Sequence, residues 1–369
     1  MEKNFHTRSQ AHTGSCLGRH CLGGSASRVD EFNVAKAGGA CNSPGSQAER
    51  QSLGTRCWRL AKSVNMIAII ALVIIANSLI ANPLLMSSVI AQQPDFIASP
   101  LTKPGEFTPG IEGPACDRKG DVFVVNFARQ QTIGRVSPDG QGTVWVTLPG
   151  ESTGNGIVFD PIGTMYIADY VGHNVLRAKP GSNQIEVFAH NEAMNQPNDL
   201  AIAPDGTLYA SDPNWKESTG QLWKISQSGQ TQRIADSMGT TNGIEVSPDG
   251  KWLYVNESVQ RNVWKFPIKP DGSLGEKILI KQFSEHSFDG MRCDVKGNLY
   301  ITRHGKGTVI VMTPAGEILR EINVLGSRPS NLCFGGADGK TVYVTEVDQT
   351  RLVQFRSDSP GLAWTRWKQ

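Results

Sequence analysis

Six oxygen-bearing side chains recur at one position of a repeated pattern. Each lies eight residues before a turn glycine, and these glycines are Gly120, Gly163, Gly206, Gly250, Gly297 and Gly339. The six side chains belong to Glu112, Asn155, Asn198, Asn242, Asp289 and Asn331. All of them offer a carboxylate or amide oxygen, and none is a histidine or a cysteine. An oxygen-only donor set disfavours Zn²⁺ and suits Ca²⁺ or Mg²⁺.

The two carboxylates of this set, Glu112 and Asp289, favour a bound cation. Confined in a narrow space they repel, and one stays protonated unless a cation neutralises them. A simpler interpretation is that Asn-Gly and Asp-Gly pairs mark turns, which explains Asn155 and Asn331 but not Glu112. The pattern therefore predicts one divalent ion, most readily Ca²⁺, with Mg²⁺ or another divalent ion as the alternative.

The same glycines reveal the elements that must position these oxygens. Successive glycines are 43, 43, 44, 47 and 42 residues apart, and each precedes a short apolar strand with a central Tyr or Phe. A period near 44, made of strands and turns, is typical of one four-stranded propeller blade. We predict an all-β, six-bladed β-propeller over residues 95–369, with antiparallel blades around a central channel. The first strand of each blade lines that channel, so the six oxygens form a ring.

The sixth repeat lacks an outer strand at the C-terminus. We expect Asp95–Leu101 to supply it, with Leu362–Trp367 as the alternative. A closed ring leaves no terminal blade without a neighbour, and no capping repeat is visible.

A second set of side chains lies three residues after the repeated aromatic. It consists of Asn126, Asp169, Asp212, Glu257, Arg303 and Glu346. These residues begin loops on the face where we place the metal, and most are expected to brace turns. Asp212 and the pair Arg303–His304 are the candidates for substrate contact, together with Asn155 and Asn331 of the first ring.

The N-terminal region has a different character. Residues 66–91 are uncharged and apolar and end in Val-Ile-Ala before Gln92, which indicates a signal peptide; an uncleaved membrane anchor is the alternative. Either way the rest of the chain lies outside the cytoplasm, periplasmic or secreted if cleaved, tethered to the membrane if not. We predict that residues 1–65 are an unstructured leader, and we attribute it to a translation start assigned too far upstream.

Charge and cysteine content limit the partners. The chain has 36 Lys/Arg and 34 Asp/Glu, of which nine Lys/Arg and four Asp/Glu lie in residues 1–65. Residues 66–91 are uncharged, so residues 92–369 hold 27 basic and 30 acidic residues. This acidic balance argues against nucleic acid. Three cysteines remain in that region, Cys116, Cys293 and Cys333, and we expect buried free thiols rather than a disulfide framework. We expect a monomer.

Several stretches resemble a known family, that of senescence marker protein, gluconolactonase and luciferin-regenerating enzyme. They are EGPACD (112–117), QPNDLAIAPDGTLYASDP (196–213), TNGIEVSPDG (241–250), FDGMRCDVKGNLYIT (288–302) and SNLCFGG (330–336). At Gln196 the animal sugar-lactonase branch usually has Arg, so this chain is more similar to the bacterial gluconolactonase-like branch.

The resemblance implies a Ca²⁺-type lactonase or related esterase. The family's metal ligands correspond to Glu112, Asn198, Asn242 and Asp289, while Asn155 and Asn331 would shape the pocket. We therefore predict metal-assisted hydrolysis of a small lactone or ester, with Asp289 as both ligand and general base. Gly-x-Ser-x-Gly occurs once, at 150–154, but in a repeat of strands and turns and not at the strand-to-helix elbow of a serine hydrolase, which argues against that class of enzyme. The alternatives are a non-enzymatic exported binding propeller with a structural Ca²⁺, and a lyase or isomerase on the same scaffold.

Overall fold

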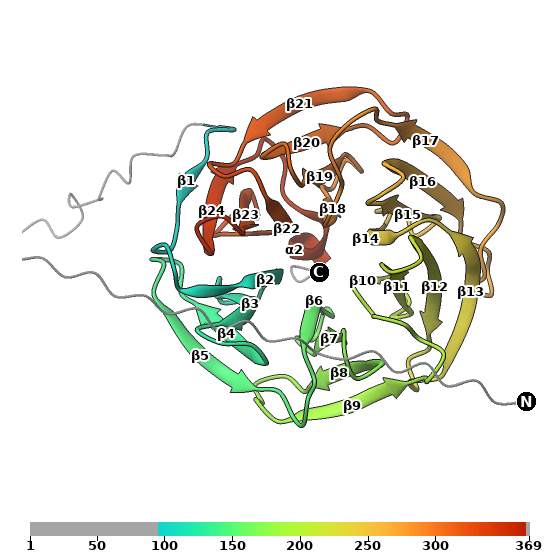
Figure 1. Cartoon of the computed structure of the whole chain (residues 1–369), viewed down its shortest axis with the longest axis horizontal. Helices are drawn as coiled ribbons and strands as arrows, with labels where there is room; N and C mark the ends of the chain where they lie inside the picture. The colour runs from blue at the N-terminus through green and yellow to red at the C-terminus, as the bar shows by residue number, and fades with distance from the viewer. Residues whose placement is uncertain (1–94, 367–369) are drawn as a thin grey trace, which may run out of the picture. The chain divides into compact units, whose positions relative to one another are not determined.

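The computed structural model describes residues 95–366, which form a ring of six antiparallel four-stranded sheets around a channel (Figure 1). The predicted six-bladed β-propeller is confirmed. Blade 1 consists of β2 (Phe107–Cys116), β3 (Val122–Phe127), β4 (Thr132–Val136) and β5 (Gly142–Thr147). Blade 2 consists of β6 (Gly154–Phe159), β7 (Met165–Asp169), β8 (Asn174–Ala178) and β9 (Ile185–His190). Blade 3 consists of β10 (Leu200–Ile202), β11 (Leu208–Asn214), β12 (Thr219–Ile225) and β13 (Thr231–Met238).

The second half of the ring follows the same order, from an inner strand to an outer one. Blade 4 consists of β14 (Thr241–Val246), β15 (Trp252–Glu257), β16 (Asn262–Pro267) and β17 (Ile278–Gln282). Blade 5 consists of β18 (Met291–Cys293), β19 (Leu299–Arg303), β20 (Thr308–Met312) and β21 (Ile318–Asn323). Blade 6 consists of β22 (Pro329–Gly335), β23 (Thr341–Glu346), β24 (Arg351–Arg356) and β1 (Ser99–Pro100).

The core is divided into six apolar clusters, each shared by two neighbouring blades. The repeated aromatic packs in the cluster that joins its blade to the next one: Tyr209 contacts blade 4, Tyr254 contacts blade 5, and Tyr343 contacts blade 1. A buried aromatic ring removes a large apolar area from water. The repeated aromatics therefore hold neighbouring blades together around the ring.

The turn glycines are required by the backbone. All six have φ between 71° and 96°, a left-handed conformation that costs side-chain-bearing residues steric strain. Each glycine ends a tight turn between the first and second strands of its blade, which explains why glycine spacing identifies the repeat.

The ring is closed by the N-terminal segment. β1 pairs antiparallel with β24, with Ser99 opposite Gln354, and Asp95 forms a bridge to Arg356. The predicted closure by Asp95–Leu101 is confirmed. The alternative is wrong, because Leu362–Arg366 form a short helix, α2, instead of a strand.

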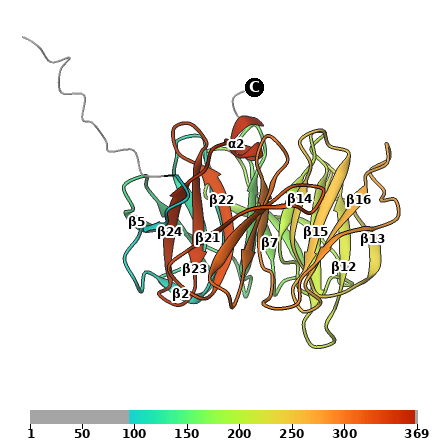
Figure 2. The same ribbon diagram turned by 90° about the horizontal axis from the view of Figure 1, so that it is seen from above.

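Helix α2 lies at one end of the channel, beside the turns between the first and second strands (Figures 1 and 2). Its Trp364 donates to the carbonyl of Gly336 at 3.1 Å, and Arg366 donates to the carbonyl of Ile202 at 2.5 Å. Leu362 packs in the cluster between blades 4 and 5. The helix therefore covers the end of the channel opposite the start of the inner strands.

The predicted leader (1–65) and signal peptide (66–91) lie outside the described residues. Within residues 95–366, no helix is long and apolar enough to cross a membrane. The three cysteines of the propeller are buried free thiols, as expected.

Candidate functional site

A cavity of about 370 Å³ opens at the end of the channel where the inner strands begin. Five of the six predicted ring residues line it: Glu112, Asn155, Asn198, Asn242 and Asp289. The sixth, Asn331, is fully buried and does not line the cavity. The structure therefore brings five of the six predicted side chains to one cavity.

Main-chain hydrogen bonds between neighbouring blades hold these residues in place. Four ring residues are followed by glycine, and Gly156, Gly243 and Gly290 each donate from N–H to a carbonyl of the next blade at 2.7, 3.0 and 2.7 Å. A methyl group on Gly113 would lie 1.8 Å from the carbonyl oxygen of Asn155, and one on Gly290 would lie 2.0 Å from Asn331 Oδ1. Glycine after the ring residue thus permits a close approach of adjacent blades. The Asn-Gly and Asp-Gly pairs do not mark turns here.

Three amide oxygens in the cavity wall lack hydrogen-bond donors. Oδ1 of Asn155, Asn198 and Asn242 is buried and accepts no hydrogen bond from any residue between 95 and 366. The amide nitrogen of Asn242 donates to Ser258 Oγ at 3.0 Å. A buried carbonyl without a partner costs roughly 1–3 kcal/mol. Three unpartnered carbonyl oxygens at one site indicate a ligand that these oxygens coordinate, such as a cation.

The two carboxyl groups have perturbed acidity. Burial raises the pKa of Glu112 to about 7, against the lowering effects of the Gly113 N–H and of Asn331. Burial, and next the charge of Glu112, raise the pKa of Asp289 well above its ordinary value. The two groups repel each other as anions, and a cation between them removes that repulsion. Two carboxylates and three free amide oxygens fit a hard divalent cation.

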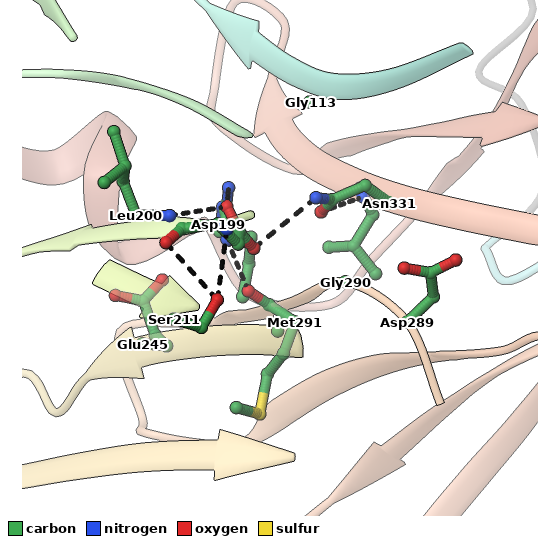
Figure 3. A network of polar contacts seen from close by, with 12 residues as sticks. Gly113, Asp199, Leu200, Ser211, Glu245, Asp289, Gly290, Met291 and Asn331 are labelled. Carbon is green, nitrogen blue, oxygen red and sulfur yellow. Dashed lines mark hydrogen bonds and ion pairs between the residues drawn. The ribbon is translucent and has the colours of Figure 1, made fainter. Parts of the chain in front are cut away.

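Asn331 differs from the other ring asparagines. Its Oδ1 already accepts from the Leu332 N–H at 2.8 Å, and its Nδ2 donates to Glu112 Oε2 at 3.0 Å. The same Nδ2 lies 3.4 Å from Asp199 Oδ2, a contact drawn in Figure 3. Asn331 therefore offers nitrogen, not oxygen, and positions Glu112.

A buried ion pair lies under the ring, and sequence reasoning missed it. Arg292 donates to both oxygens of Asp199, at 2.8 and 2.9 Å, and both side chains are almost fully buried. Burial raises the pKa of nearby Glu245, whereas Arg292 and Arg366 lower it. Arg292 and Glu245 each lie three residues after a ring member, a position that lines the channel below the ring. The alignment that located the ring could have located these two residues as well.

The second predicted set braces loops. Asp212 is fully buried, and its carboxylate accepts hydrogen bonds from four donors of its own blade: the Asn195 and Gln196 N–H groups, Gln221 Nε2 and Trp223 Nε1. Arg303 is also buried; it donates to the Glu285 carbonyl and stacks on Phe283. Neither side chain lines the cavity. The structure thus argues against substrate contacts from Asp212 and Arg303.

His304 does line the cavity. Burial and the neighbouring charge of Arg328 lower the pKa of His304, so its imidazole is neutral near pH 7 and can donate or accept a hydrogen bond. Tyr170, Trp215 and Arg328 also line the mouth and were not predicted. Tyr170 and Trp215, like His304, each begin a four-residue loop between the second and third strands of a blade, and Arg328 directly precedes β22. The residue types at these places differ between blades, so the repeat gave no signal for them.

Clusters of three or more His, Cys, Asp or Glu side chains that could hold a metal are absent from residues 95–366. The ring instead combines two carboxylates with amides. It is the amide oxygens, identified by position in the repeat, that complete the candidate site.

Comparison with known proteins gives a consistent result. A gluconolactonase of Zymomonas mobilis is 26% identical over 63% of this chain and 75% of its own length. A diisopropyl-fluorophosphatase of Loligo vulgaris is 26% identical over 72% of this chain and 95% of its own. The solved structure of a calcium-binding regucalcin from Agrobacterium tumefaciens has the same fold, with a TM-score of 0.59 at 19% identity over 71% of this chain and 94% of its own. Residues 110–348 match the model described as the SMP-30/gluconolactonase/LRE-like region, and the chain belongs to that family.

Proposed function

We propose that the protein is a divalent-metal-dependent hydrolase of lactones or related esters. Four residues would hold the ion: Glu112, Asn198, Asn242 and Asp289. The observation that carries this proposal is the convergence of unpartnered amide oxygens and two acidity-perturbed carboxyl groups in one cavity. Ca²⁺ is the proposed ion, because the donor set is all oxygen, with two carboxylates and two neutral amides.

A divalent cation bound there supplies polarisation of the acyl oxygen and acidification of a nearby water. Asp289 is half-buried and faces the cavity, so one of its oxygens is available to a water molecule. We propose that Asp289 takes the proton of that water as the new C–O bond forms. The proton then passes to the leaving alkoxide oxygen as the ring C–O bond breaks, which gives a hydroxy acid. Asn155 Oδ1, unpartnered in the same wall, would accept a hydrogen bond from that water.

The relatives support this class of reaction. The names of the Zymomonas mobilis and Loligo vulgaris proteins both denote hydrolases, one acting on a lactone and the other on a fluorophosphate. The two substrates share an electrophilic centre bonded to an oxygen that gains negative charge during attack. An oxygen-rich cation site serves both cases.

The test is a hydrolysis assay with the full chain, first dialysed against chelator and then supplied with Ca²⁺, Mg²⁺ or Zn²⁺. The panel contains γ-butyrolactone, δ-valerolactone, δ-gluconolactone and p-nitrophenyl acetate. We expect hydrolysis that depends on Ca²⁺ and is lost on chelation. Fully metal-loaded protein that hydrolyses none of them would contradict the enzyme proposal and favour a binding propeller with a structural ion.

A further inference from the structure

Three apolar side chains are exposed in corresponding loops on the face of the ring where the cavity opens, and one of them, Trp215, lines the cavity. Val171, Trp215 and Val259 are 47%, 38% and 47% exposed. They follow β7, β11 and β15, in the loops that lead to the third strands of blades 2, 3 and 4. Single exposed apolar residues are normal. Three at matching places on consecutive blades form a surface, which we call the apolar arc.

Hydrogen bonds join the three loops. The Trp215 side chain is hydrogen-bonded to Tyr170, and since an indole can only donate, the Tyr170 hydroxyl accepts. Gln260 Nε2 donates to the Ser218 carbonyl at 2.8 Å, and Gln260 Oε1 accepts from the Thr240 N–H at 2.8 Å. The arc is therefore one connected wall.

The arc is continuous with the cavity. Tyr170 and Trp215 line the cavity as well as belonging to these loops. Ser258, which precedes Val259, accepts a hydrogen bond from ring residue Asn242. When the acyl group of a substrate lies on the ring, any substituent that projects toward blades 2 to 4 therefore contacts the apolar arc.

The opposite side of the mouth has a different character. His304 follows β19 of blade 5, and Arg328 immediately precedes β22 of blade 6. In a six-membered ring, blade 2 lies across from blade 5 and blade 3 across from blade 6. The mouth thus has an apolar side and a side with a neutral imidazole and a guanidinium.

We propose that the substrate is a lactone or ester with an alkyl or aryl substituent, which lies along the apolar arc. This inference rests on the proposed hydrolase function and names the substrate class of the same site. A polyhydroxylated substituent would lose water against Val171 and Val259, and those side chains offer no hydrogen bond in return. An apolar substituent gains from the same contact.

The experiment measures kcat and KM of the Ca²⁺-loaded full chain on γ-lactones with side chains of increasing length: γ-butyrolactone, γ-hexalactone, γ-octalactone and γ-decalactone, with δ-gluconolactone for comparison. We expect kcat/KM to rise about two- to fourfold for each methylene that reaches the arc. We expect this rise to come from a lower KM and not from a higher kcat, because the substituent contacts the arc equally in the ground state and the transition state.

The double variant Val171→Ser/Val259→Ser should flatten this dependence while leaving γ-butyrolactone hydrolysis unchanged. The matched control is Ile162→Ser, an exposed isoleucine (71%) in the turn after β6, away from the mouth; it should keep the wild-type slope. Equal unfolding temperatures confirm that all variants fold.

The outcomes separate the two proposals. Hydrolysis of short lactones without any chain-length dependence, or a preference for δ-gluconolactone, overturns the apolar substrate class but leaves the hydrolase intact. A slope that survives the double variant also overturns it. If no lactone is hydrolysed, the proposed function fails and this inference fails with it.

Discussion

Asn331 donates a hydrogen bond to Glu112 at 3.0 Å, across the junction between the last blade and the first. The two residues are 219 positions apart in the chain. This contact orients one of the two carboxyl groups of the candidate metal site, and it forms only when the ring is closed. The metal site and the closure of the fold are therefore linked.

Replacing either carboxylate should separate metal binding from proton transfer. Asp289→Asn keeps an oxygen but removes the proposed base, so at saturating Ca²⁺ turnover should fall by about 10²–10⁴. The matched variant Glu112→Gln removes one charge and should weaken Ca²⁺ binding, yet regain most turnover once the site is full. Asn155→Ala should cost less than Asp289→Asn. Metal content and kcat are measured together; wild-type turnover by fully loaded Asp289→Asn would show that it is not the base.

Calcium should stabilise the native state. A ligand that binds only the folded protein adds about 2.7 kcal/mol to the free energy of unfolding at 100 times its Kd. We expect thermal unfolding to shift upward with Ca²⁺ and downward with chelator, and the shift to shrink in Glu112→Gln. An unfolding temperature indifferent to both reagents would argue against the site.

Without metal, stability should fall as the pH rises from about 4.5 to about 7. Glu112 has an ordinary pKa of 4.5 in the unfolded chain and about 7 when buried in the fold, so the folded state binds more protons across this interval. The free energy of unfolding then decreases by up to about 1.4 kcal/mol per pH unit for each such group. Asp289 acts in the same direction. Urea unfolding of chelator-dialysed protein checks the slope, and excess Ca²⁺ should abolish it.

Removing one partner of the buried ion pair should be costly. Arg292→Met leaves Asp199 charged and uncompensated, which we expect to lower the free energy of unfolding by about 3–5 kcal/mol. The double variant Asp199→Leu/Arg292→Met should lose less than the sum of the two single variants, because no isolated charge remains. Denaturant unfolding of the four proteins measures this coupling, and strict additivity would contradict it.

We propose that the protein is exported and that its mature form begins near Gln92. The apolar segment 66–91 ends in small residues of the kind that signal peptidases recognise. N-terminal sequencing of protein recovered outside the cytoplasm should therefore start close to Gln92. Recovery of a chain that retains residues 1–60 in protease-resistant form would contradict the proposal.

The sequence predicted the blades and the ring from their repeat, but it missed Arg292 and Glu245, which lie at a repeated position, and the loop residues whose types differ between blades. The blades, Glu112 and the ring asparagines follow from turn glycines at one period, because equivalent strand positions face the channel. Asp212 was misjudged because its position in the repeat does not give the side-chain direction, and its carboxylate accepts hydrogen bonds from donors within its own blade. Trp215 and Arg328 were missed because the residue types at their loop positions differ between blades. Only the fold brings them to the cavity mouth.

The strand β1 has a consequence for how the protein is made. It precedes every other strand yet pairs with the last one, and Thr102 Oγ1 accepts from the Leu352 N–H over a separation of 250 residues. Such distant contacts are slow to form, because the entropy of closing a long loop is lost before the contact is gained. Until β24 is present, β1 has no partner strand and the ring cannot close. The proposed calcium site, in which Asn331 of the last blade orients Glu112 of the first, would therefore be complete only after the ring has closed.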